Sequence, residues 1–392
     1  MRWDIFCKVI DNFGDIGVCW RLARDLAGRG QRVRLFADDA SALTWMATLP
    51  HDDIEVWPWH APLVVPDEVR SSPPDVVIEA FGCDLPEAYL AAINTPHRSP
   101  APVWLNLEYL SAEGYVERSH LLPSPVWNGP GAGLKKVFFY PGFTERTGGL
   151  LREPGLLEQC DAWRNALRDQ VSPAEKWWRE QALPWRPDAL RISLFCYAPS
   201  AVGPMLDAWA HSTRPIDLIV TPGQAQAAVN AWAGREGARE EPFPPLERGA
   251  LRCLPLPAPL PQPTFDHLLW SCDLNVVRGE DSAVRALWAG APHLWDIYRQ
   301  DDGVHADKLH AFEARWMSDW PEALRAPVCL VQASLNGLSG LPGDGTPSAA
   351  WAWLLGPEGW PLWQHHQRAS RQQLAQQRDL TTQLLEFVRS AR

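Results

Sequence analysis

The change from an apolar run to charged residues near position 278 is the first stretch whose residue types could do chemistry. The apolar run 273–277 is followed by the start of a helix-like segment, whose first residues are Arg278, Gly279, Glu280, Asp281 and Ser282. Free amides at a helix start bind anions such as phosphate, and an arginine adds a charged donor. A carboxylate here would accept a hydrogen bond from a ribose hydroxyl or orient the arginine. The pattern predicts a phosphate-binding turn; the alternative is a capped helix with a surface ion pair.

A second polar turn follows the first apolar run of the chain. Two carboxylates, Asp11 and Asp15, flank a tight turn that contains Phe13 and Gly14. Carboxylates in a loop can orient a substrate or accept a proton from it, and glycine lets the backbone approach a ligand. We therefore interpret this turn as part of the functional site. The alternative is that Asp15 only caps the helix that follows.

Two aromatic residues alternate onto one face after another apolar run. They are Phe195 and Tyr197, within 193–200. Aromatic rings beside a phosphate site favour stacking on a nucleotide base. Taken as isolated residues, the same two side chains are more often part of a hydrophobic core.

The sequence contains no pattern typical of a metal site or of a nucleophilic hydrolase. The acidic pairs in 37–39 and 300–303 lack the DxD spacing, and His305 and His310 are five residues apart, so they do not share a helix face. There is no GxSxG motif and no CxxC pair. We predict chemistry without a metal ion or a bound cofactor.

The composition excludes several classes of function. The net charge of -11 argues against a bulk nucleic-acid binder, which would need a basic face. No apolar run approaches the length of about 18 residues that a membrane span requires. The N-terminal residues include acids and lack the uninterrupted apolar core of a signal peptide. We expect a cytoplasmic protein that contacts neither membrane nor nucleic acid directly.

Strand-like apolar runs alternate with helix-like segments in both halves of the chain. The runs are 3–9, 32–37, 75–81, 103–109, 135–141, 191–198, 216–221, 251–256, 273–277 and 292–297. Nearly continuous apolar strands are typical of a parallel sheet that is covered on both faces. The alternation therefore predicts an α/β protein with two Rossmann-like, doubly wound domains facing across a cleft. Such sheets bind ligands at the carboxyl ends of their strands.

The boundary between the two domains is expected near residues 177–190, where two prolines interrupt the pattern. We predict a first domain over 1–182 and a second over 183–362. The polar segment 363–392 has apolar positions at helical spacing, which predicts a long terminal helix. The proline-rich stretch 255–263 is interpreted as a rigid connection rather than a polyproline recognition peptide.

Several long motifs in these turns resemble one family, the elongation factor P arginine rhamnosyltransferases. They are WDIFCKVIDNFGDIGVCWRLARDL, VVIEAFGCDLP, WLNLEYLSAE, LPSP, YPGFTERTGGLL and RGEDSAVRALWAG. The resemblance runs from residue 3 to beyond residue 300. It implies a GT-B fold whose C-terminal helix returns to the first domain, which binds the acceptor, while the second domain binds the nucleotide sugar.

The resemblance also implies an activity. Members transfer L-rhamnose from dTDP-β-L-rhamnose, a co-substrate, to an arginine of bacterial elongation factor P, with inversion and without a metal. The modified factor helps ribosomes through consecutive prolines.

The resemblance assigns roles to individual residues where the motifs match. The two loop aspartates fall on Asp11 and Asp15, and the second is the general base. The base-stacking aromatic pair falls on Phe195 and Tyr197, and a glutamine near the base falls on Gln262. The stretch that binds diphosphate and ribose falls on Arg278, Glu280, Asp281 and Ser282.

Two other functions remain open at the level of the sequence. One is a GT-B glycosyltransferase with another donor, such as a UDP-sugar, or with another acceptor. The other is a binding protein that reads a nucleotide or the elongation factor without transferring anything. Competition between dTDP-rhamnose and UDP-sugars distinguishes the first alternative from the implied activity. The mass of the acceptor after incubation distinguishes binding from modification.

Overall fold

The computed structural model describes most of the 392-residue chain and divides it into two compact units. The described residues are 1–10, 13–47, 51–60, 63–95, 100–166, 171–197, 199–235, 243–299, 303–338 and 345–392, with the side chains of 199–201 left out. Unit 1 comprises Met1–Pro154 and Gln376–Arg392, and unit 2 comprises Gly155–Ala375. Asp11 lies outside the described residues.

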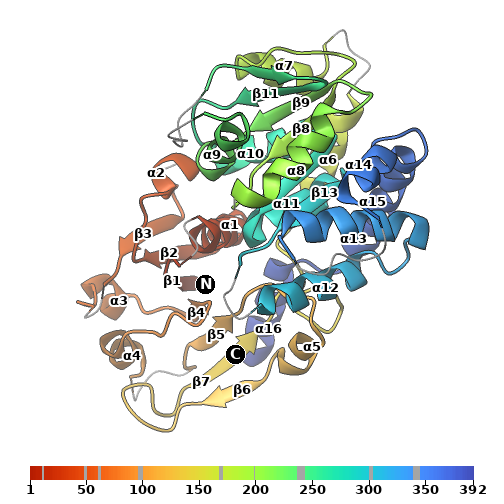
Figure 1. The fold of residues 1–392 in the computed structure, drawn as a ribbon. Helices are drawn as coiled ribbons and strands as arrows, with labels where there is room; N and C mark the ends of the chain where they lie inside the picture. The colour runs from red at the N-terminus through yellow and green to blue at the C-terminus, as the bar shows by residue number, and fades with distance from the viewer. Residues whose placement is uncertain are drawn as a thin grey trace. The chain divides into compact units, whose positions relative to one another are not determined.

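Unit 1 is built on a seven-stranded sheet in the order β3-β2-β1-β4-β5-β7-β6 (Figure 1). Its strands are β1 (Arg2–Cys7), β2 (Arg32–Ala37), β3 (Ile54–Pro58), β4 (Val76–Ala80), β5 (Val103–Leu107), β6 (Pro123–Pro125) and β7 (Lys135–Phe139). All neighbours pair in parallel except the short edge strand β6, which is antiparallel to β7. The predicted parallel sheet of the first domain is confirmed.

Helices cover both faces of this sheet. They are α1 (Gly14–Gly28), α2 (Leu43–Met46), α3 (Asp67–Ser71), α4 (Glu87–Ile93), α5 (Gly114–Ser119) and the terminal α16 (Leu380–Ala391). One core joins the sheet to α1 and α16, and the second joins its other face to α3 and α4. Alternating side chains supply the two cores, because successive residues of a strand point to opposite faces.

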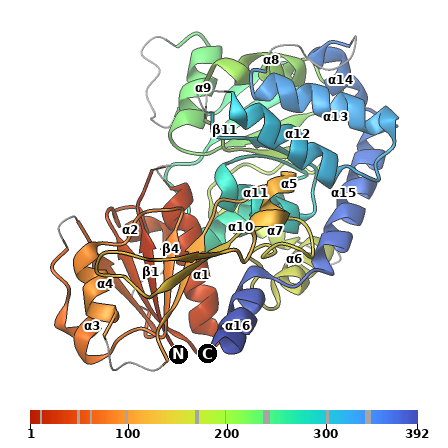
Figure 2. The same ribbon diagram turned by 90° about the horizontal axis from the view of Figure 1, so that it is seen from below.

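The terminal helix α16 belongs to unit 1 because it packs against α1 (Figure 2). Arg29, at the end of α1, donates to Asp379 at 2.8 Å and to Thr382 at 2.6 Å. Asp379 in turn caps α16 by accepting from the Thr382 amide at 2.8 Å. The expected return of the C-terminal helix to the first domain is thereby confirmed.

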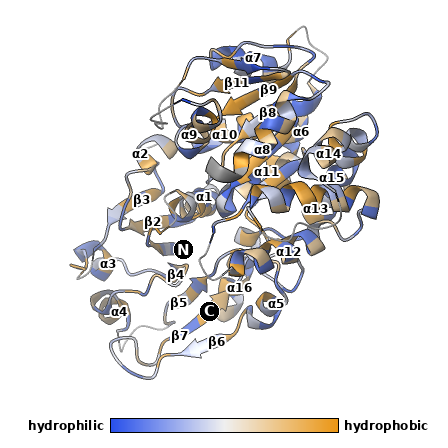
Figure 3. Ribbon diagram, viewed as in Figure 1, coloured by the Kyte–Doolittle hydropathy of each residue, from blue (hydrophilic) through white to orange (hydrophobic). Residues whose placement is uncertain are grey.

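Unit 2 contains a six-stranded sheet in the order β10-β11-β9-β8-β12-β13. Its strands are β8 (Leu190–Leu194), β9 (Ile216–Val220), β10 (Leu246–Arg248), β11 (Leu251–Pro255), β12 (Leu274–Arg278) and β13 (His293–Asp296). Only β10 pairs antiparallel among them. Four of the five residues of β9 are apolar, the exception being Asp217, and all five are buried (Figure 3).

The helices of unit 2 are α6 (Leu156–Asn165), α7 (Pro173–Glu180), α8 (Pro199–Ala210), α9 (Gln224–Trp232), α10 (Gln262–Ser271), α11 (Gly279–Ala289), α12 (Val304–Trp316), α13 (Glu322–Leu335), α14 (Pro347–Leu354) and α15 (Gly359–Ala375). The stretch 255–263 links β11 to α10, as the sequence predicts.

The units divide earlier than the expected boundary at residue 182. Residues 155–182 belong to unit 2 because α6 and α7 pack on α10 and α11. In α6, the Trp163 indole donates to the Ser271 hydroxyl at 3.1 Å, and Arg164 donates to the Trp270 carbonyl at 3.3 Å. The terminal segment is also two helices rather than one: 363–375 lies in α15 of unit 2, and only 376–392 lies in unit 1.

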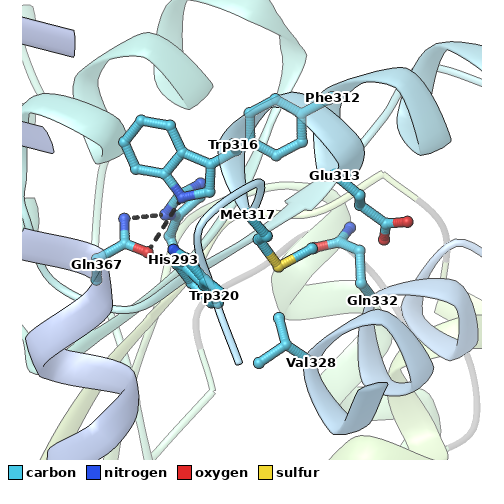
Figure 4. A pocket seen from close by; sticks show the side chains of 9 residues that line it. All are labelled: His293, Phe312, Glu313, Trp316, Met317, Trp320, Val328, Gln332 and Gln367. Atoms are coloured by element: carbon cyan, nitrogen blue, oxygen red, sulfur yellow. Dashed lines mark hydrogen bonds between the residues drawn. The ribbon is translucent and has the colours of Figure 1, made fainter. Parts of the chain in front are cut away.

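A small cavity lies among α12, α13, α15 and β13 in unit 2 (Figure 4). Its volume of about 10 Å³ has room for about one water molecule, so it cannot hold a nucleotide sugar. The Gln367 amide nitrogen lies 2.7 Å from Nδ1 of His293, and burial lowers the pKa of that imidazole to about 4. Burial also raises the pKa of the Glu313 carboxyl to about 7.

We predict that Glu313→Gln stabilises the protein at alkaline pH. In the unfolded chain this carboxyl ionises near its ordinary value of 4.5, whereas in the folded protein its pKa is about 7. Stability is therefore lost as the pH rises from 4.5 to 7, and glutamine, which does not ionise, avoids that loss. We expect the variant to gain about 3 kcal/mol in free energy of unfolding at about pH 8, and about 1 kcal/mol at about pH 5.

Denaturant unfolding of wild type and variant at the two pH values measures this difference. Glu358→Gln is the matched control, because Glu358 is exposed on the same unit. Glu358→Gln should change the free energy of unfolding by the same small amount at both pH values. A Glu313→Gln effect that is the same at both pH values would contradict the account.

Candidate active site

Each sheet has one place where the chain order reverses, and the candidate residues gather there. In unit 1 the chain runs from β1 to β2 and β3 on one side, and then returns to β4 on the other. In unit 2 it runs from β8 to β9 and β11, and then returns to β12. Open parallel sheets bind ligands beyond the carboxyl ends of the strands at such a reversal. Those ends are therefore the places to build a site.

Arg278 is the last residue of β12 and is held over two aromatic rings. Its guanidinium carbon lies 4.5 Å from the ring centroid of Phe195 and 4.6 Å from that of Tyr197. Its side chain is buried, and both rings are half-buried. These distances are those of cation–π contacts, which orient the planar guanidinium. The structure thus brings together three residues that the sequence analysis singled out at the ends of two different strands, β8 and β12.

The start of α11 follows Arg278 directly. Gly279 has φ +65, the left-handed region that favours glycine, so the chain turns sharply from strand to helix at this residue. Glu280 and Asp281 occupy the first turn, and Ser282 is buried behind them. Lys308 of α12 donates to Glu280 at 2.8 Å, which holds that carboxylate beside the turn. The surface ion pair of the alternative fits only in part, because the Lys308–Glu280 pair is half-buried.

The loop after β8 is fixed by Asp296, which the sequence analysis did not single out. Asp296 ends β13, and its Cα pairs with that of Arg278 across the sheet. The Tyr197 amide donates to the Asp296 carboxylate at 2.6 Å, and Asp296 is buried. The sequence did contain a signal for Asp296. Like Arg278, it is a charged residue at the end of an apolar strand.

Gln262 is the first residue of α10 and is buried. The same helix carries Phe265, whose ring meets the Phe195 ring edge-to-face at 5.7 Å. Gln262 therefore begins a helix that packs on Phe195, one member of the aromatic pair. Prolines on both sides of it suit a helix start, where a missing amide proton costs nothing.

In unit 1, Asp15 lies in the first turn of α1 and is buried. The N-cap residue is Phe13, so Asp15 is not the capping residue that the alternative supposed. Its carboxylate accepts from the Ile10 amide at 2.8 Å, which ties the two ends of the loop 10–15 together. The Phe13 ring is exposed at 39% and meets the Trp45 ring edge-to-face at 5.1 Å. Gly14 begins α1.

The described residues show no metal centre or membrane span. No three His, Cys, Asp or Glu side chains are grouped to hold a metal ion within the described ranges. None of the helices described is both long enough and apolar enough to cross a bilayer.

Comparison with known proteins places this architecture among glycosyltransferases. The structure superposes on the glycosyltransferase VinC in complex with dTDP with a TM-score of 0.54 and covers 99% of both chains. At 13% identity, that likeness concerns the fold. The protein is thus an α/β protein of GT-B type, built from two Rossmann-like units, as expected.

Closer relatives narrow the activity. A protein-arginine rhamnosyltransferase of Pseudomonas putida is 43% identical over 99% of both chains. A solved structure described as the structural basis for EarP-mediated arginine glycosylation of translation elongation factor EF-P shares 32% identity, with a TM-score of 0.67 over 100% of this chain and 99% of that one. A family model for the EF-P rhamnosyltransferase EarP matches residues 3–389. The chain therefore belongs to the EarP family of elongation factor P rhamnosyltransferases.

Proposed function

We propose that this protein transfers L-rhamnose from dTDP-β-L-rhamnose to an arginine side chain of bacterial elongation factor P. The modified factor supports translation of polyproline stretches in the cytoplasm. The observation that carries the proposal is Arg278, held over Phe195 and Tyr197 at the start of α11. This arrangement offers fixed positive charge and aromatic rings at the switch point of unit 2, in a chain of the EarP family.

Unit 2 would bind the nucleotide sugar. Arg278 and the amides of α11, from Gly279 to Ser282, would hold the diphosphate. Glu280 and Asp281 would bind the ribose or orient Arg278, and Phe195, Tyr197 and Gln262 would contact the thymine end. Positive charge aimed at the departing diphosphate stabilises the charge that develops there, so the reaction needs no metal ion.

Unit 1 would bind the acceptor. A guanidinium is a poor nucleophile because its lone pairs are delocalised and it stays protonated at neutral pH. Asp15 would accept its proton as the bond forms between nitrogen and the anomeric carbon. The bond from that carbon to the diphosphate oxygen breaks in the same step, and dTDP leaves. Asp11 would orient the acceptor, and Phe13 and Gly14 would contact the donor.

This single displacement inverts the anomeric centre, because nucleophile and leaving group stand on opposite faces of the sugar. The pKa of a carboxylate is far below that of a guanidinium, so proton transfer occurs late. Much of the rate enhancement then comes from holding the two reactants in line. In well-oriented reactions this lowers the activation barrier by on the order of 7–11 kcal/mol.

We predict that Arg278→Lys weakens dTDP binding by about 10- to 100-fold, as measured by calorimetry. Lysine keeps the charge but lacks the planar fork that stacks on Phe195 and Tyr197 and binds two phosphate oxygens. Arg368→Lys on the exposed face of α15 is the control and should bind dTDP as wild type does. Equal affinity of wild type and Arg278→Lys would remove Arg278 from the donor site.

We predict that Asp15→Asn lowers the transfer rate by about 10²- to 10⁴-fold while dTDP affinity is unchanged. Asparagine retains an oxygen for the Ile10 amide but cannot accept a proton. Asp38 accepts from the Val9 amide of the same loop at 2.8 Å, so Asp38→Asn controls for the loop tether. Near-normal turnover by Asp15→Asn would refute its role as the general base.

Donor competition tests the proposed function against the alternative of a GT-B glycosyltransferase that uses another donor, such as a UDP-sugar. Elongation factor P, this protein and equal amounts of dTDP-β-L-rhamnose and a UDP-sugar are incubated together, and the released nucleotides are separated by chromatography. We expect dTDP release that depends on the presence of elongation factor P. Preferential consumption of the UDP-sugar, or dTDP release without the factor, would contradict the proposal.

A further inference from the structure

The carboxyl ends of β4, β5 and β7 carry acidic and aromatic side chains that the reaction above does not use. Ala80, Leu107 and Phe139 are aligned across these strands. The Phe81 amide donates to the Leu107 carbonyl at 2.7 Å, and the Glu108 amide donates to the Phe139 carbonyl at 3.0 Å. The residues that leave the three strands therefore emerge side by side on one edge of the unit 1 sheet.

This edge carries more negative than positive charge. Glu79 is fully buried, and both of its oxygens lie 3.2 Å from the Lys136 ammonium. Half-buried Glu108 accepts from the Asn106 amide at 2.8 Å, and within the described residues no ion pair joins Glu108 to a cation. Burial, followed by the charge of Glu79, raises the pKa of Glu108, and the charge of Lys136 and the Asn106 hydrogen bond offset this only in part. A cation from outside would offset this repulsion, because an opposite charge favours the ionised carboxylate.

Aromatic residues follow the ends of the same strands. Tyr109 follows Glu108, is exposed at 37%, and stacks on Phe81 with centroids 4.4 Å apart and planes at 16°. Tyr140 meets Tyr115, exposed at 42%, edge-to-face at 5.9 Å. The Glu108 amide bonds to the carbonyl of Phe139, the residue before Tyr140, and burial and then the charge of Glu108 raise the pKa of Tyr140 to about 12. A carboxylate beside flat aromatic faces suits a planar guanidinium, which binds both.

We propose that this edge of unit 1 holds the guanidinium of the acceptor arginine, with Glu108 as its anionic partner and Tyr109 and Tyr140 as its aromatic walls. The proposal rests on the proposed function and deepens it. β1, which leads to Asp15, pairs with β4, and β4 pairs with β5. Glu108 follows β5, and β1, which precedes Asp15 in the chain, lies two strands away, about 10 Å at the usual strand spacing. An arginine held by Glu108 thus reaches the edge where Asp15 acts.

The surroundings favour an arginine presented by a protein over a free amino acid. The turn and hairpin beside Tyr140 expose large apolar side chains, Leu122 at 50% and Trp127 at 81%. They are continuous with the aromatic walls, because the Leu121 amide donates to the Phe138 carbonyl at 2.8 Å and Phe138 stacks on Tyr140. Exposed apolar groups beside a charged site are typical of a surface that contacts a protein.

The test is a double-mutant cycle on binding. The affinity of this protein for elongation factor P is compared with its affinity for the same factor carrying methionine at the acceptor arginine, with dTDP present. We expect wild type to prefer the arginine form by about 10- to 100-fold. In Glu108→Gln the preference should fall to within about threefold, while dTDP affinity stays the same. Glu87→Gln, exposed on α4, is the control and should keep the full preference.

Further variants separate binding from folding. Glu108→Asp keeps the charge and should restore part of the preference for the arginine form. Tyr109→Phe keeps the aromatic ring and should retain this preference, whereas Tyr109→Leu should lose it. If wild type neither binds nor modifies elongation factor P, the proposed function itself fails. If wild type modifies the factor but Glu108→Gln and Tyr109→Leu retain the full preference for arginine, the guanidinium site is refuted. If Glu108→Gln does not fold, the Glu108→Asp and Tyr109 pairs decide the question.

Discussion

Parallel strand pairing is the constraint on which the whole arrangement depends. A parallel sheet delivers all of its strand ends to one edge, and at the point of chain reversal the two flanking connections leave in opposite directions. In unit 2 this brings Phe195 and Tyr197, after β8, against Arg278 at the end of β12. In unit 1 it brings Glu108, after β5, to the edge of the sheet at which β1 also ends. Residues far apart in the sequence become neighbours without any long loop.

The charges of the two edges are opposite, so a protein of net charge -11 offers separate places for the anionic donor and the cationic acceptor that we propose. The unit 2 edge presents Arg278 and a helix start, and suits an anionic donor. The unit 1 edge presents Asp15 and Glu108, and suits a cationic acceptor. In each unit a lysine is already engaged by a carboxylate, Lys308 by Glu280 and Lys136 by Glu79. Local arrangement, not total charge, therefore sets what each edge binds.

The sequence predicted the Arg278 turn and most of the parallel strands because their signals are local, whereas β3 and the short antiparallel edge strands β6 and β10 were not predicted. Buried parallel strands are continuous apolar runs, and a glycine after a strand marks a sharp turn into a helix. The sequence did not predict Asp296, Lys308 or Glu108, because their partners lie on other elements and only tertiary packing joins them. The boundary after Pro154 was missed for the same reason: the packing of α6 on α10 decides it, and no proline or glycine pattern marks it.

Intact-protein mass spectrometry of elongation factor P tests the central claim most directly. The purified factor is incubated with this protein and dTDP-β-L-rhamnose in the presence of EDTA. The account predicts the gain of one deoxyhexose, located on one arginine by fragmentation. No gain, with the factor folded and the donor intact, would contradict the proposed acceptor. A gain that appears only without EDTA would contradict the assignment of leaving-group stabilisation to Arg278 and the α11 amides.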